Sequence, residues 1–152
     1  DYLQTGEWQP RPSRATLASA MDVGNPSNME RLRWLFGDIE HLRGAFSAQS
    51  VSDDTIRATI KRDYAALHQT WCPHTATAAH LYTTLPASRR QERWVLVGTA
   101  HPAKFNDVVE PLIGAEVPVP PALAELLSLP SLQRDVAPTL DSLRQVLTGS
   151  AT

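Results

Sequence analysis

The stretch from Gly98 to Phe105 combines a hydroxyl, an imidazole and a helix-starting proline directly after an apolar run. Residues 94–98 are apolar at every position, which is typical of a strand buried on both faces of a parallel sheet. A helix is predicted to begin at Pro102. Since α/β proteins bind ligands beyond the carboxyl ends of such strands, Thr99 and His101 are candidate cofactor or substrate contacts. The alternative is a plain connection in which His101 caps the helix.

A second polar stretch, from Ser19 to Arg31, leads into a strongly periodic segment. Ser27 and Glu30 have the spacing of a capping box, with Ser27 as the N-cap, which predicts a turn and a helix start. Free backbone N–H groups at the same helix N-terminus would also suit a phosphate. Ser27, Asn28 and Arg31 are therefore candidate anion-binding residues, and the two interpretations are compatible.

A third stretch holds Cys72, His74 and His80. Cys72 and His74 are two positions apart, so a helix would direct them to different sides. No second cysteine completes a zinc pattern. We therefore expect no metal site, and we expect Cys72 to pack in the interior rather than act as a nucleophile.

Helices are the main elements predicted to position these stretches. Apolar residues recurring every three or four positions predict one continuous helix that starts after Ser27 and ends near residue 46, although Gly37 weakens it. Residues 16–25 are expected to form a short strand or a buried loop. Further helices are predicted from Ser52, from Pro73 to about Thr84, after Pro102, over 122–129 and over 138–148.

Composition narrows the possible partners and location. The chain has 152 residues and a net charge of −2, so it lacks the basic surplus expected of a protein that binds nucleic acid or an anionic membrane. No apolar run approaches the length of a membrane span. The single cysteine excludes an internal disulfide and fits a cytoplasmic protein. Because the first residue is not Met, the chain is expected to start inside a larger protein. The strand at 94–98 lacks obvious neighbours, so either the domain is mostly helical with a small sheet or the rest of the sheet lies on polypeptide outside this chain.

Three sequence blocks occur in the order AMDVGNPSNMERL, CPHTA and GTAHPAKF. In this combination the chain resembles, over essentially its whole length, the C-terminal part of threonine synthases. These are pyridoxal-phosphate (PLP) enzymes of the tryptophan-synthase-β-like family. The resemblance implies an α/β protein of fold type II, with a helix-rich segment and few strands here. Residues 1–113 would be part of the large PLP-binding domain, and residues 114–152 would be a C-terminal helical extension.

The resemblance also implies a reaction, in which the whole enzyme converts O-phospho-L-homoserine and water to L-threonine and phosphate with PLP. The Thr99 hydroxyl would face the pyridine nitrogen of the cofactor, and Ser27, Asn28, Arg31 and His101 would bind the substrate or its phosphate. In this family the lysine that binds PLP covalently lies upstream. The chain would then hold no catalytic residue, and its partners would be the substrate and the remaining N-terminal part of the enzyme. The alternative is a non-catalytic binding module or a truncated relative.

Overall fold

The computed structural model describes residues 1–149, and every regular element in that range is a helix. The chain divides into two compact units, Asp1–Pro118 and a second one from Val119 onward. The described elements are α1 (Tyr2–Thr5), η1 (Ser19–Met21), α2 (Asn28–Phe36), α3 (Ile39–Ala45), α4 (Asp53–Leu67), α5 (Pro73–Thr84), α6 (Ala87–Arg90), η2 (Pro102–Phe105), α7 (Asn106–Ile113), α8 (Pro121–Leu127) and α9 (Leu140–Thr148).

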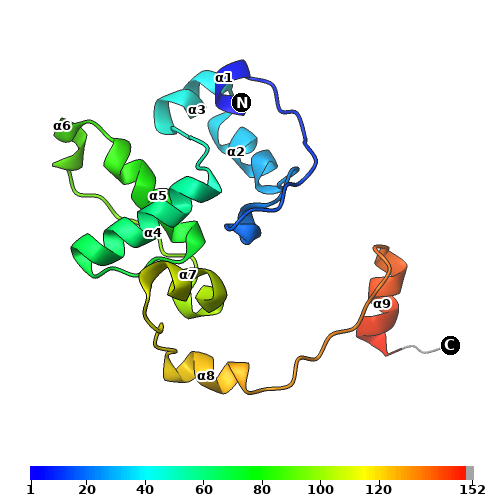
Figure 1. Cartoon of the computed structure of the whole chain (residues 1–152). Coiled ribbons are helices and arrows are strands. Elements are labelled where there is room, and N and C mark those ends of the chain that lie inside the picture. Colours follow the sequence, from blue (N-terminus) through cyan, green and yellow to red (C-terminus); the bar gives the residue numbers. More distant parts are fainter. Residues whose placement is uncertain (150–152) are drawn as a thin grey trace. The chain divides into compact units, whose positions relative to one another are not determined.

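The centre of the first unit is the packing of α4 against α5 and α7 (Figure 1). One face of α4 is buried at successive helical spacings and includes Ile56 and Ile60, which are almost fully covered. The facing part of α5 buries Ala76 and Ala79, whose small side chains allow the helices to approach closely. Val109 of α7 completes this core and is also fully buried.

The predicted starts of α4 and α5 are confirmed. The hydroxyl of Ser52 accepts a hydrogen bond of 3.3 Å from the backbone N–H of Thr55, which is the geometry of an N-cap. The thiol of Cys72 accepts one of 3.4 Å from the N–H of Thr75. Cys72 is buried in this position, as expected for a packed cysteine.

The prediction of one continuous helix that ends near residue 46 is wrong, because the segment forms two helices, α2 and α3. Gly37 has a φ of 70°, a left-handed conformation that ends α2. Asp38 then starts α3, and its carboxylate accepts a hydrogen bond of 2.9 Å from the N–H of His41. The predicted capping box is also wrong, since Ser27 has helical dihedral angles and makes no side-chain cap bond.

The strand predicted at 94–98 is wrong for the described chain. This segment has no regular secondary structure and pairs with no other segment among residues 1–149. Val95 and Val97 are 81% and 68% exposed, in contrast to the double burial expected from their apolar pattern. A strand needs a neighbour to satisfy its backbone groups, and the described residues supply none. Residues 16–25 likewise form no strand, but a loop that contains η1.

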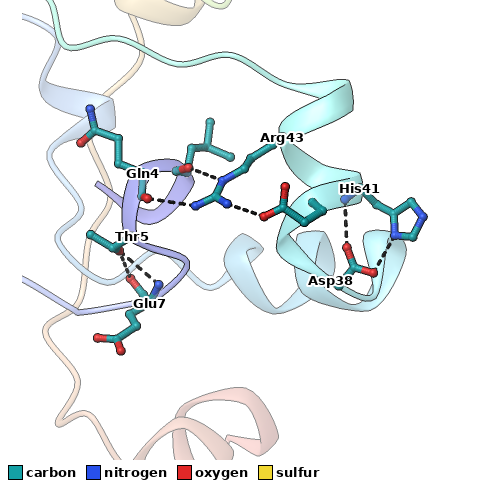
Figure 2. A network of polar contacts seen from close by, with 8 residues as sticks. Gln4, Thr5, Glu7, Asp38, His41 and Arg43 are labelled. Carbon is teal, nitrogen blue, oxygen red and sulfur yellow. Dashed lines mark hydrogen bonds and ion pairs between the residues drawn. The ribbon is translucent and has the colours of Figure 1, made fainter.

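Arg43 of α3 joins the N-terminal segment to the fold, as Figure 2 shows. Its guanidinium donates hydrogen bonds of 2.7 Å and 2.9 Å to the carbonyl oxygens of Leu3 and Gln4, which belong to α1. Glu40 forms an ion pair with the same guanidinium. This contact holds the four-residue α1, which is too short to be stable alone, against α3.

The second unit holds α8 and α9, close to the two short helices expected there. Thr139 caps α9 by accepting a hydrogen bond of 3.2 Å from the N–H of Ser142. Residues 114–118 belong to the first unit. Val117 is buried there, and its N–H donates a hydrogen bond of 3.0 Å to the carboxylate of Glu110. The domain assignment of 1–113 and 114–152 stays a prediction, and residues 150–152 lie outside the described range.

Candidate functional site

The imidazole of His74 connects two of the polar stretches that the sequence singles out. His74 lies in the first turn of α5 and is only 7% exposed. Its Nε2 accepts a hydrogen bond of 3.0 Å from the backbone N–H of Ala20 in η1. Its ring also packs on Phe105 of η2, with 5.0 Å between ring centroids. The loop around η1 and the segment after Gly98 are therefore held by one side chain.

Gly98 passes close to the same end of α5. A Cβ at Gly98 would lie 3.9 Å from the hydroxyl of Thr75, so the backbone here runs in ordinary contact with the helix. Thr99 follows and is exposed. Its hydroxyl has no hydrogen-bond partner among residues 1–149 and is free to bind another group.

His101 caps η2, which confirms the alternative interpretation that this residue is a helix cap. Its Nδ1 accepts a hydrogen bond of 3.2 Å from the N–H of Ala103. An accepting Nδ1 carries no proton, so the neutral ring has its proton on Nε2. Since His101 is exposed, that N–H remains available to an acidic ligand.

The loop before α2 is held by side chains that bond to its backbone. Asp22 accepts hydrogen bonds of 2.7 Å from both the N–H and the hydroxyl of Thr16. Asp53, at the start of α4, accepts one of 3.1 Å from the N–H of Leu17. Sequence reasoning missed these two aspartates as organising residues, because each acts on main chain that the motif pattern does not identify.

An open pocket of about 850 Å³, lined by both polar and apolar groups, lies beside this loop. Its walls include Trp8, Arg14 and Asp22, so it offers both charged and aromatic surfaces. The main chain at Gly24 also lines it, bonded to Arg11 and Ser13. This concavity borders the stretch that contains the candidate anion-binding residues.

The predicted residues Ser27, Asn28 and Arg31 lie together at the start of α2, and all three are exposed. The Arg31 guanidinium has no ion-pair partner within the described chain, and neither Ser27 nor Asn28 uses its side chain in a hydrogen bond there. No hydrogen bond or ion pair joins this group to Thr99 or His101. Their connection runs through η1 and the His74 ring.

Two further features concern metals and membranes. Within residues 1–149 no three His, Cys, Asp or Glu side chains are grouped closely enough to hold a metal ion. In the same part of the chain, the helices are all too short or too polar to cross a lipid bilayer.

Comparison with known proteins gives one consistent result. The family described as threonine synthase, C-terminal, matches residues 75–147. Threonine synthase of Serratia marcescens is 38% identical over 149 residues, which cover 97% of this chain and 34% of that protein. Threonine synthase of Escherichia coli strain K12 is 34% identical over 147 residues, covering 96% and 33%. The chain thus spans about one third of the length of these relatives.

Solved structures agree with the sequence comparison. The crystal structure of Escherichia coli threonine synthase matches with a TM-score of 0.76 and 32% identity, over 97% of this chain and 34% of that one. A PLP-bound threonine synthase from Brucella melitensis matches with a TM-score of 0.59 and 24% identity, over 83% and 32%. The second likeness concerns the fold alone.

Proposed function

Because this chain belongs to the threonine synthase family, we propose that it forms the C-terminal third of an enzyme that converts O-phospho-L-homoserine and water to L-threonine and phosphate. The observation that carries the proposal is the similarity to the Serratia marcescens enzyme, which extends over 97% of the chain. The packing of the η1 loop and the η2 segment on His74 agrees with a common site. No specific observation favours the alternative of a non-catalytic module.

The cofactor of this reaction would be PLP, which supplies an electron sink for negative charge that develops on the substrate. Thr99 fits the pyridine nitrogen, because its hydroxyl is exposed and has no partner in the described chain. A neutral donor there leaves that nitrogen unprotonated, unlike a carboxylate. Lys61 and Lys104 are both exposed, so the lysine that binds PLP covalently is expected in the upstream part.

The phosphate of the substrate would lie at the start of α2. The N-terminus of this nine-residue helix carries partial positive charge, and Ser27 and Asn28 add side-chain donors. The guanidinium of Arg31 supplies a full positive charge that no carboxylate of the described chain neutralises. His101 would donate its Nε2–H to the same substrate from the η2 side.

The remaining N-terminal part of the enzyme would be the partner of this chain. The segment with exposed Val95 and Val97 is suited to become a strand beside strands of that upstream part. We place the whole enzyme in the cytoplasm, in keeping with the unpaired, buried Cys72.

The first experiment is to assay the whole protein that contains this chain for phosphate release and threonine formation from O-phospho-L-homoserine. A purified protein of about the length of 152 residues, with no PLP absorption and no turnover, would favour the non-catalytic alternative. A longer, PLP-containing protein that forms threonine would support the proposal.

Thr99→Val in the same protein tests the cofactor contact, because valine keeps the shape and removes the hydroxyl. We expect weaker retention of PLP and a kcat at least tenfold lower, equivalent to about 1.4 kcal/mol of transition-state stabilisation. Thr83→Val is the control, since its exposed hydroxyl bonds only to the carbonyl of His80 within α5. Normal kcat and normal PLP affinity in Thr99→Val would show that the assignment is wrong.

A further inference from the structure

The protonation state of His74 follows from its hydrogen bond. The backbone N–H of Ala20 can only donate, so Nε2 of His74 must accept and carries no proton. A neutral ring then has its proton on Nδ1. A doubly protonated ring would place an Nε2–H against the backbone N–H of Ala20. Two donors would then face each other, and the hydrogen bond would be lost. The neutral Nδ1–H tautomer is therefore the form that holds η1.

The other nitrogen of the same ring has no partner. Nδ1 of His74 is fully buried and makes no hydrogen bond within the described chain. An unpaired buried donor lowers stability. A leucine would pack against Phe105 without that penalty, so packing alone does not account for an imidazole here. What the imidazole adds at this position is the acceptor at Nε2.

The His74 ring lies between the η1 loop and η2. On one side it fixes η1, from which the chain runs through Asp22 and Gly24 to the start of α2. On the other side the ring contacts Phe105, four residues after His101. Asp22 and Asp53 fix the loop nearer to Thr16 and Leu17. His74 is therefore bonded to this loop and also contacts η2.

We propose that His74 is a positioning residue, which uses Nε2 to hold the η1 loop against α5 and so places the anion-binding residues of α2 relative to the segment of Thr99 and His101. His74 does not touch substrate or cofactor in this role. The kinetic consequence rests on the proposed function, whereas the structural consequence does not.

Two variants of the whole protein separate the acceptor from packing. In His74→Gln the amide oxygen reaches the place of Nε2 and keeps the acceptor, and in His74→Leu the acceptor is lost. We expect hydrogen exchange in the peptide 17–24 to accelerate at least tenfold in His74→Leu and to stay within threefold of wild type in His74→Gln. His80→Leu is the control, because that histidine lies on the same helix and its ring bonds to nothing in the described chain.

The kinetic prediction is a split between the two constants. His74→Leu should raise KM for O-phospho-L-homoserine at least tenfold with a smaller change in kcat, and His74→Gln should restore most of the KM. Unchanged exchange in His74→Leu, or equal acceleration in both variants, would overturn the positioning role. Accelerated exchange in a protein that forms no threonine would support the role of His74 and count against the proposed function instead.

A measurement on the wild type decides the matter if His74→Leu does not fold. Histidine labelled with ¹⁵N reports which ring nitrogen is protonated, and the His74 signals are those missing from His74→Gln. We expect the Nδ1–H tautomer. Finding Nε2–H, or a doubly protonated ring at neutral pH, would overturn the proposal.

Discussion

Gly24 lies where two segments of main chain meet, and a side chain has no room there. A Cβ at this position would lie 1.7 Å from the carbonyl oxygen of Arg11, far inside contact distance. The same backbone is bonded on both sides, since Gly24 accepts from the N–H of Arg11 at 3.0 Å and donates to the hydroxyl of Ser13 at 3.1 Å. The glycine thus keeps the loop before α2 against residues 11–13.

We expect Gly24→Ala to separate these segments and lower stability by about 1–3 kcal/mol, the usual cost of forcing extra atoms into a packed site. In the whole enzyme the substrate KM should rise as well, because the loop leads to Ser27. Thermal unfolding and steady-state kinetics measure the two effects.

Gly44→Ala is the control, and it should change stability in the opposite direction. No atom lies within 4 Å of its added Cβ, and alanine favours the helix by about 0.5–1 kcal/mol. Equal melting temperatures for Gly24→Ala and wild type would contradict this account.

At the scale of the element, the turn between α4 and α5 depends on Asp63. Its carboxylate accepts hydrogen bonds of 2.7 Å from Arg62 and 2.9 Å from the indole N–H of Trp71. His68 ends α4 in a left-handed conformation, and its N–H bonds to the carbonyls of Asp63 and Tyr64. Trp71 directly precedes the cap of α5, so one aspartate joins the end of α4 to the start of the next helix.

The pKa of Asp63 carries a prediction about acid. Burial disfavours the charged carboxylate, but the hydrogen bonds from Arg62 and Trp71 and the guanidinium charge lower its pKa below the ordinary value. A folded-state pKa below the unfolded one stabilises the fold above the unfolded pKa, about 4. That stabilisation is lost as the pH falls through the folded pKa. Part of the loss of stability below about pH 4 should therefore come from this group.

Asp63→Asn should cost about 1–3 kcal/mol at pH 7, as for a charge-assisted hydrogen bond whose buried partner is removed. It should also make unfolding less dependent on pH below 4. Thermal melts between pH 3 and pH 7 test both effects. Asp54→Asn is the matched control, because that carboxylate pairs with Arg57 but is 96% exposed, so it should change stability by less than about 0.5 kcal/mol. Identical pH profiles for Asp63→Asn and wild type would contradict the assignment.

At the scale of the whole molecule, residues 94–98 have the apolar sequence of a buried strand, but no neighbouring strand pairs with them in the described chain. Their backbone groups form no backbone hydrogen bond in the described chain, and Val95 and Val97 are exposed. An unpaired apolar edge of this kind promotes association. The prediction is that the isolated 152-residue chain aggregates or melts without cooperativity, whereas the whole enzyme covers the segment with its upstream part.

Val95→Thr combined with Val97→Thr distinguishes the two states, since threonine keeps the extended preference and lowers apolar exposure. The double variant should reduce association of the isolated chain, measured by light scattering, and lower the melting temperature of the whole enzyme. Leu67→Thr, at a residue 66% exposed at the end of α4, should do neither. A sharp, reversible melt of the monomeric, isolated chain would count against this prediction.

The sequence alone predicted the features that depend on neighbours in the chain. The starts of α4 and α5 follow from Ser52 and Pro73, because caps and first helical residues act within one turn. The family followed from three contiguous blocks, and the exposed Thr99 and Arg31 could be proposed as ligand-binding residues from those blocks.

Only the tertiary structure decided the rest. The break at Gly37 depends on a backbone conformation that periodicity does not show, and the strand pattern at 94–98 forms no strand because its partners are absent from the described chain. The part played by His74 could not be found from the sequence. Its bond to Ala20 spans 54 positions, and contacts over such distances are set by how α4, α5 and α7 pack, not by local pattern.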